Sequence, residues 1–151
     1  MMGFKETDTD LKFRTKQFSL RIIKLVQSLP KTTASYEIGK QLLRSGCSVG
    51  ANTRAAFRGR SKKEFVAKLG IVIEEADECY FWLDILGEAE IVKKQKLKEL
   101  MVEANELVAI FVSISKRNKK WLFKSHCFNF QSLQMNKRTH TCGELNANHV
   151  G

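Results

Sequence analysis

The sequence predicts an all-α protein, an antiparallel up-down four-helix bundle with an irregular C-terminal tail. Apolar residues recur at alternating spacings of three and four along four separate stretches, as in helices that pack side by side. One proline and few turn clusters in 151 residues favour long uninterrupted helices. The connections between the four stretches are short, as in bundles whose successive helices are antiparallel. We expect one domain over residues 1–120 and an irregular extension over residues 121–151.

The first helix is expected to begin at a cap, Asp8 or Asp10, and to run to about Ser28. Pro30 ends it, because proline disfavours helical geometry in the residue before it. Thr15 occupies the one position that the apolar seam skips. The seam residues are Leu11, Phe18, Ile22, Leu25 and Leu29.

The second helix is expected to start at Thr32 or Thr33, either of which can cap it. Its seam residues are Ile38, Leu42, Ser45, Val49, Asn52 and Ala56. Ser45 and Asn52 are polar at core positions. We predict that they are structural and hydrogen-bond to backbone or to a partner helix, with ligand binding as the alternative.

Glycines in the second helix predict a close contact with another helix. Gly46 and Gly50 each weaken a helix by about 1 kcal/mol relative to alanine. A sequence tolerates this loss where a neighbouring backbone must approach. We therefore expect Gly50 and Ala51 to lie against another helix.

The third helix is introduced by a capping box. Gly59 fits the end of the second helix, and Ser61 and Glu64 have the spacing at which the serine oxygen accepts the glutamate amide while the carboxylate reaches back. The seam that follows is Phe65, Leu69, Val72, Ala76, Cys79, Leu83 and Leu86. A second apolar set lies beside and opposite it: Ile71, Ile73, Tyr80, Phe81, Trp82 and Ile85. Because a monomeric core needs only one face, this excess predicts a contact with another subunit. Four acidic residues between positions 74 and 78 are expected to meet the basic second helix, within or between subunits.

The fourth helix is expected to run from about Lys93 to Lys119. A basic run closes it, which suits the negative end of the helix dipole. Its seam residues are Leu97, Leu100, Ala104, Leu107, Phe111 and Ile114. No sustained period continues after Lys120, so the rest of the chain is expected to be irregular.

The net charge of +10 is unevenly distributed. Residues 12–68 contain fourteen Lys and Arg but two acids, whereas residues 69–120 contain eight basic and ten acidic residues. This asymmetry favours a polyanionic partner, RNA or DNA; a basic face that only maintains solubility is the alternative. The candidate nucleic-acid-binding residues belong to the turn between the second and third helices: Arg54, Arg58, Arg60, Lys62 and Lys63. Phe57 and Phe65 are expected to pack inward, so base stacking is not indicated.

Cysteine usage and the N-terminal residues indicate a cytoplasmic protein. Cys47 and Cys79 lie on predicted helices and are expected to be buried among apolar residues as free thiols. The N-terminal residues lack the apolar stretch of a signal peptide. No apolar run approaches the roughly 18–20 residues of a membrane span. We therefore expect a reducing compartment and no membrane partner.

No pattern of an enzyme or a cofactor site stands out. His126, Cys127, His140 and Cys142 are zinc-ligand types, but their spacing departs from the usual spacers of two to four residues. All three histidines follow residue 120. None is therefore placed to complete a carboxylate–histidine metal site in the bundle or to activate a serine there. We predict no metal, no cofactor and no catalytic residue.

The serine–asparagine helix and the capping box together resemble a known family. Leu43-Arg44-Ser45, Cys47-Ser48-Val49 and Asn52, then the basic turn and Ser61-Lys62-Lys63-Glu64-Phe65, are similar to the bacterial rRNA intervening-sequence proteins. Accessory proteins of diversity-generating retroelements are similar in kind. The resemblance covers about residues 10–120.

The resemblance implies a ring-shaped homopentamer whose basic surface binds nucleic acid, without catalytic activity. In the retroelement branch it also implies a reverse transcriptase as partner. The common family form has Ile-Ala-Glu-Gly after the asparagine. This chain instead has Thr53-Arg54-Ala55-Ala56, which lacks the glutamate and adds a positive charge.

Two functions of different classes follow from these observations. The first is an oligomeric, basic nucleic-acid-binding accessory protein that acts with rRNA or a reverse transcriptase. The second is a structural or protein-interaction module whose charge serves solubility or docking. Salt-dependent binding to RNA and DNA would separate the two, because phosphate contacts weaken steeply with salt.

Overall fold

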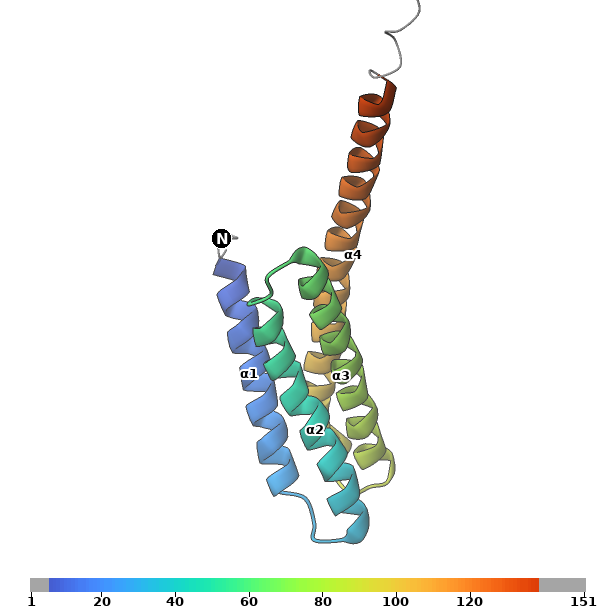
Figure 1. The fold of residues 1–151 in the computed structure, drawn as a ribbon. Helices are drawn as coiled ribbons and strands as arrows, with labels where there is room; N and C mark the ends of the chain where they lie inside the picture. The colour runs from blue at the N-terminus through green and yellow to red at the C-terminus, as the bar shows by residue number, and fades with distance from the viewer. Residues whose placement is uncertain (1–5, 139–151) are drawn as a thin grey trace, which may run out of the picture.

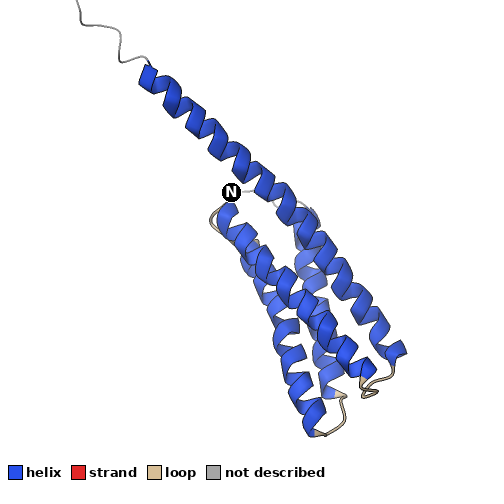
Figure 2. Ribbon diagram, turned by 90° about the vertical axis from the view of Figure 1, so that its right-hand side faces the viewer, coloured by secondary structure: helices blue, strands red, loops and turns tan. Residues whose placement is uncertain are grey.

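The computed structural model describes the backbone of residues 6–138 and the side chains of residues 10–119. It contains four helices: α1 Glu6–Gln27, α2 Thr33–Ala56, α3 Lys62–Glu88 and α4 Lys94–Arg138. The helices run alternately down and up, and short loops join them (Figures 1 and 2). The predicted all-α up-down bundle is confirmed, and no strand occurs within residues 6–138.

Two predicted boundaries differ from the structure. α1 already begins at Glu6, so Asp8 and Asp10 lie inside the helix and neither caps it. α4 continues to Arg138 and projects beyond the end of the bundle (Figure 1). The prediction of an irregular segment is therefore wrong for residues 121–138, while residues 139–151 lie outside the described part. The sequence has no glycine or proline between residues 94 and 142 that would interrupt the helix.

The four predicted seams meet in one core. Its buried apolar residues include Phe18, Ile22, Leu42, Val49, Leu69, Val72, Ala76, Cys79, Leu83, Leu86, Leu97, Leu100, Ala104, Leu107 and Phe111. Near the end of α2 the buried polar residue is Thr53, while Asn52 is half-buried. A straight α-helix drifts relative to a strict seven-residue repeat, which moves the seam by one position along α2.

α1 and α2 approach closely at two glycines. Ser19 Oγ donates to the Gly46 carbonyl oxygen at 2.6 Å. A Cβ on Gly46 would lie 2.7 Å from Ile22 Cγ2, and a Cβ on Gly50 would lie 2.7 Å from Ser19 Oγ. The structure thus places Gly50 against α1, as the sequence predicted, whereas Ala51 is exposed and takes no part in this contact.

Most of the second apolar set on α3 is already covered within one chain. Ile73, Tyr80 and Trp82 pack against the core, because α3 lies between α2 and α4 and contacts both. Phe81 is the exception, with 52% of its surface exposed. The apolar excess that predicted a second subunit is therefore reduced largely to one exposed aromatic ring.

Ion pairs join neighbouring helices along the sides of the bundle. Arg44 of α2 pairs with Glu75 at 3.4 Å and with Glu78, both on α3. The prediction that acids of the third helix meet the basic second helix is confirmed within the chain. The pairs that join α1 to α4 are Arg14–Glu103, Arg14–Glu106 and Arg21–Glu99.

The two described cysteines have opposite environments. Cys79 is buried, as predicted, but Cys47 is exposed, so the prediction for that residue is wrong. Cys47 lies off the α2 seam and its side chain is not covered by a neighbouring helix. Cys127 and Cys142 fall outside the described side chains. Within the described residues, no helix has both the length and the apolar character that a membrane crossing requires.

Candidate nucleic-acid interface

The α2–α3 turn is a tight piece of backbone whose amides are already satisfied. After α2 ends, the amides of Phe57, Arg58 and Gly59 donate to carbonyls of the last helical turn at 3.3, 3.1 and 3.0 Å. Such bonds commonly close a helix end. The turn therefore holds its side chains on a fixed support at one end of the bundle (Figure 1).

The predicted capping residues fix the start of α3. Ser61 Oγ accepts the amide hydrogen of Glu64 at 3.1 Å. The Glu64 carboxylate accepts the amide of Arg60 at 3.0 Å. It thus reaches one residue further back than in the usual capping box, where it binds the amide of the cap residue itself. Both groups hold the turn together.

Four of the five predicted phosphate ligands are exposed on this turn. Arg54, Arg58, Arg60 and Lys63 make no ion pair with any side chain among residues 10–119. Lys62 is half-buried and has a contact within the chain. The structure therefore gathers four exposed cations at one end of the bundle, and separates Lys62 from them by its burial.

The aromatic residues of the turn contact each other. Phe57 and Phe65 are half-buried, with ring centroids 5.6 Å apart in an edge-to-face arrangement. Lys12 Nζ of α1 lies 5.5 Å from the centroid of the Phe57 ring, which ties α1 to the turn. These rings are thus part of the packing at this end, in agreement with the expectation that they would not offer a platform for bases.

α4 adds cations that the sequence analysis assigned to another role. Lys116, Arg117 and Lys119 are exposed on α4. They were expected to complement the dipole at a helix end, but the helix continues to Arg138, so they lie in its interior. The absence of any helix-breaking residue after them was the sequence signal for this position.

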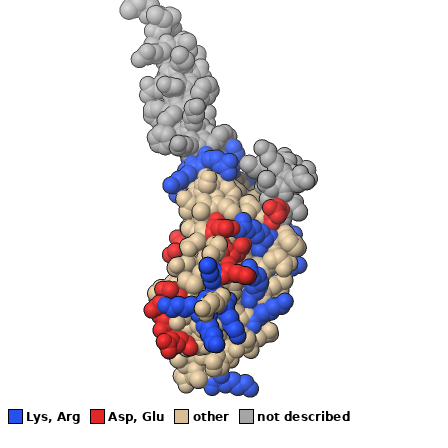
Figure 3. Space-filling model, turned by 180° about the vertical axis from the view of Figure 1, so that it is seen from behind, with Lys and Arg blue, Asp and Glu red and all other residues tan. Residues whose placement is uncertain are grey.

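The sides of the bundle differ electrostatically from the α2–α3 turn. Along the sides, Arg14, Arg21 and Arg44 are each held by glutamates of a neighbouring helix. Figure 3 shows Lys and Arg mixed with Asp and Glu along the rear face, and a group of Lys and Arg near the end of the described part of α4. Positive charge at the turn lacks such neutralisation, so a polyanion is attracted to that end.

The predicted structural polar residues of α2 are satisfied by their own helix. Ser45 Oγ donates to the Gln41 carbonyl at 3.1 Å and lies 3.2 Å from Cys79 Sγ, which donates to it. Asn52 Nδ2 donates to the Ser48 carbonyl at 3.0 Å. Burial raises the pKa of the Cys79 thiol to about 12, so it stays protonated at neutral pH. These groups offer neither an open ligand site nor an activated nucleophile.

The residues considered above as zinc ligands fall outside the described side chains: His126, Cys127, His140 and Cys142. Among residues 10–119, no group of three or more His, Cys, Asp and Glu side chains is arranged to hold a metal ion.

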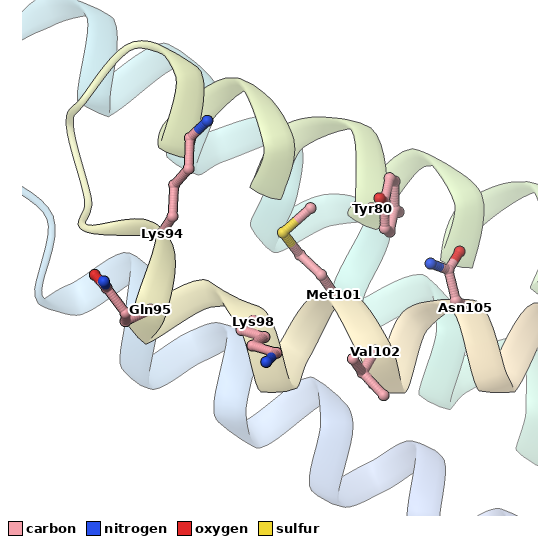
Figure 4. A pocket seen from close by; sticks show the side chains of 7 residues that line it. All are labelled: Tyr80, Lys94, Gln95, Lys98, Met101, Val102 and Asn105. Atoms are coloured by element: carbon pink, nitrogen blue, oxygen red, sulfur yellow. The ribbon is translucent and has the colours of Figure 1, made fainter.

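A groove between α3 and α4 was not anticipated. It has a volume of about 400 Å³ and is lined by Tyr80, Lys94, Gln95, Lys98, Met101, Val102 and Asn105 (Figure 4). Val102 is 49% exposed within it. The sequence signal was an apolar residue that stands off the α4 seam, and the seam analysis did not use it.

Comparison with known proteins identifies the family. The family model described as 23S rRNA-intervening sequence protein matches residues 7–113. The crystal structure of a protein of unknown function, titled as a member of the S23 ribosomal protein family, from Bacteroides thetaiotaomicron is 32% identical in sequence. The match covers 72% of this chain and 97% of that chain, with a TM-score of 0.68. No curated protein matches the chain. The match of most of the chain to the family model shows that this protein belongs to the 23S rRNA-intervening sequence protein family.

Proposed function

We propose that this protein is a non-enzymatic, oligomeric accessory protein that binds RNA or DNA through the α2–α3 turn. One observation carries the proposal. Arg54, Arg58, Arg60 and Lys63 are exposed at one end of the bundle without an acidic partner among the described side chains, while arginines on its sides are paired. Unpaired cations can replace the counterions of a phosphate backbone, which drives binding.

The chemistry of the turn favours contacts to phosphates over contacts to bases. Its two phenylalanines are engaged with each other, and no helix presents a row of amide and carboxylate side chains for base edges. Phosphate contacts position a protein on nucleic acid without reading its sequence. We therefore expect duplex or structured RNA and DNA to bind with little sequence preference.

Assembly would strengthen this binding. The resemblance to the intervening-sequence proteins favours a homopentamer, which would present the α2–α3 turn five times and raise avidity without any new contact. The resemblance to retroelement accessory proteins makes a reverse transcriptase the protein partner to test. Both points belong to the proposal and are supported by the resemblance.

A charge-neutral triple variant tests the binding surface. Replacing Arg58, Arg60 and Lys63 by glutamine removes three cations and leaves Ser61 and Glu64 intact. Binding to mixed-sequence duplex RNA should weaken for every sequence, and the slope of log affinity against log salt should fall by about one for each phosphate that the variant no longer neutralises. Fluorescence anisotropy at several salt concentrations measures both quantities.

A matched control carries the same charge change at the opposite end of the bundle. Lys24, Lys31 and Lys96 are exposed there and have no ion pair with a described side chain. Their triple glutamine variant should retain most of the affinity. Equal losses in both variants would show that only net charge matters. If the parent protein binds no nucleic acid at low salt, the protein-interaction module is the better description.

A further inference from the structure

The outer face of α3 carries an acidic stripe with an exposed aromatic ring at its centre. The chain has seven Asp and Glu and no Lys or Arg between Lys68 and Lys93. Two of these acids are bound by Arg44 of α2. Others are exposed at helical spacings around Phe81, and we call this set the Phe81 stripe: Glu74, Asp77, Phe81 and Asp84.

The acids of the Phe81 stripe have no ion pair with any side chain among residues 10–119. Phe81 stands four residues after Asp77 and three before Asp84, which places the three on one helix face. Its ring packs edge-on against Trp82, with centroids 4.9 Å apart, and remains 52% exposed. An exposed phenylalanine between unpaired carboxylates fits a partner that offers an apolar pocket with a basic rim.

The groove between α3 and α4 has that character. Met101, Val102 and the Tyr80 ring form an apolar surface in it (Figure 4). Lys94 and Lys98 stand at its edge, and Lys98 has no ion pair with a described side chain. Lys94 is bound to Glu88, so Lys98 is the cation available to a carboxylate from outside.

One copy cannot bring these two surfaces together, because Phe81 contacts Trp82 and does not line its own groove. We propose that the Phe81 stripe of one copy docks into the α3–α4 groove of a second copy, with Phe81 on Val102 and Asp84 near Lys98. The acidic stripe repels phosphates, which favours a protein over a nucleic acid as the partner of this face.

The two docking surfaces are different patches of the same chain, so the contact is head-to-tail. Contacts of this kind close into rings or continue as filaments. The inference rests on the oligomer in the proposed function and assigns residues to its subunit contact. It also leaves the α2–α3 turn of each copy uncovered for nucleic acid.

The experiment combines light scattering with charge exchange. Phe81→Glu and Val102→Glu should each shift the full-length protein from an oligomer toward the 17.3 kDa monomer, with at least a roughly tenfold weaker association, as expected for a central apolar anchor. Asp84→Lys and Lys98→Glu should each weaken assembly, and the double variant should recover it. Tyr36→Glu, at an aromatic residue on α2 that is 68% exposed, is the control and should leave the mass unchanged.

The outcomes that would overturn the proposal are distinguishable. An oligomer whose mass is unchanged in Phe81→Glu and Val102→Glu overturns this interface and leaves the assembly standing. A parent protein that is monomeric at all concentrations overturns both. Because substitution at exposed positions can still impair folding, each variant is checked by circular dichroism, and the charge exchange decides the matter without relying on the loss of a large side chain. Weakened assembly without recovery in the exchanged double variant overturns the pairing of Asp84 with Lys98.

Discussion

Gly46→Ala tests how closely α1 and α2 must approach. The added methyl carbon would lie 2.7 Å from Ile22 Cγ2 and 3.0 Å from two further atoms of that side chain. Ile22 is fully buried and branched, so it cannot swing aside. Overpacking of this kind costs about 1–3 kcal/mol, while alanine gains about 1 kcal/mol of helix propensity over glycine. The net free energy of unfolding should therefore fall by up to about 2 kcal/mol.

Gly70→Ala is the matched control, because a Cβ there would meet no atom within 4 Å. Its helix propensity gain is the same, so the difference between the two variants isolates the packing contribution of about 1–3 kcal/mol. For a chain of this size each 1 kcal/mol shifts the melting temperature by about 2–4 °C. Gly70→Ala should melt above the parent and Gly46→Ala below Gly70→Ala by about 2–12 °C.

Thermal unfolding followed by circular dichroism measures both variants. Equal melting temperatures for the two alanine variants would refute the close approach of α1 and α2. The double variant Gly46→Ala with Ile22→Ala adds a second check, because removing the obstructing side chain should cancel part of the clash. The two substitutions should therefore be non-additive.

Three further predictions follow from the described contacts. Gly50→Leu should lower the free energy of unfolding by about 1–3 kcal/mol, and an unchanged denaturation midpoint would show that this position is open. At pH 8, alkylation followed by mass mapping should label exposed Cys47 quickly and spare buried Cys79, whose raised pKa of about 12 keeps it a thiol; equal labelling in the native protein would contradict its burial. The hydrogen bond from Arg44 lowers the pKa of Glu78 in the folded state, so its stabilisation is present above the usual glutamate pKa of about 4.3 and is lost as the pH falls through the lowered value. Glu78→Gln should destabilise the protein at pH 7 and flatten the pH dependence of stability below about pH 5; a parallel acid titration of parent and variant would contradict this.

The sequence by itself determined the helix order, the seams and the caps. These features depend on residues within one or two turns of each other. The spacing of Leu69, Val72 and Ala76 places them on one face of any helix, and Ser61 lies within reach of the Glu64 amide whatever surrounds them. The length of α4 was also readable, since no glycine or proline follows Lys94 before Gly143, but the loss of apolar period was given more weight than the absence of helix breakers.

Tertiary structure decided which side chains are covered and which charges are neutralised. Cys47 is exposed and Thr53 replaces Asn52 in the core, because the path of the neighbouring helices sets which off-seam positions are buried. Arg44 is neutralised by glutamates more than thirty residues away in the chain, whereas Arg58 meets none among the described side chains. Sequence spacing cannot report that difference, since ion pairing depends on contacts between helices that are distant in sequence, and it is this difference that selects the α2–α3 turn as the candidate interface.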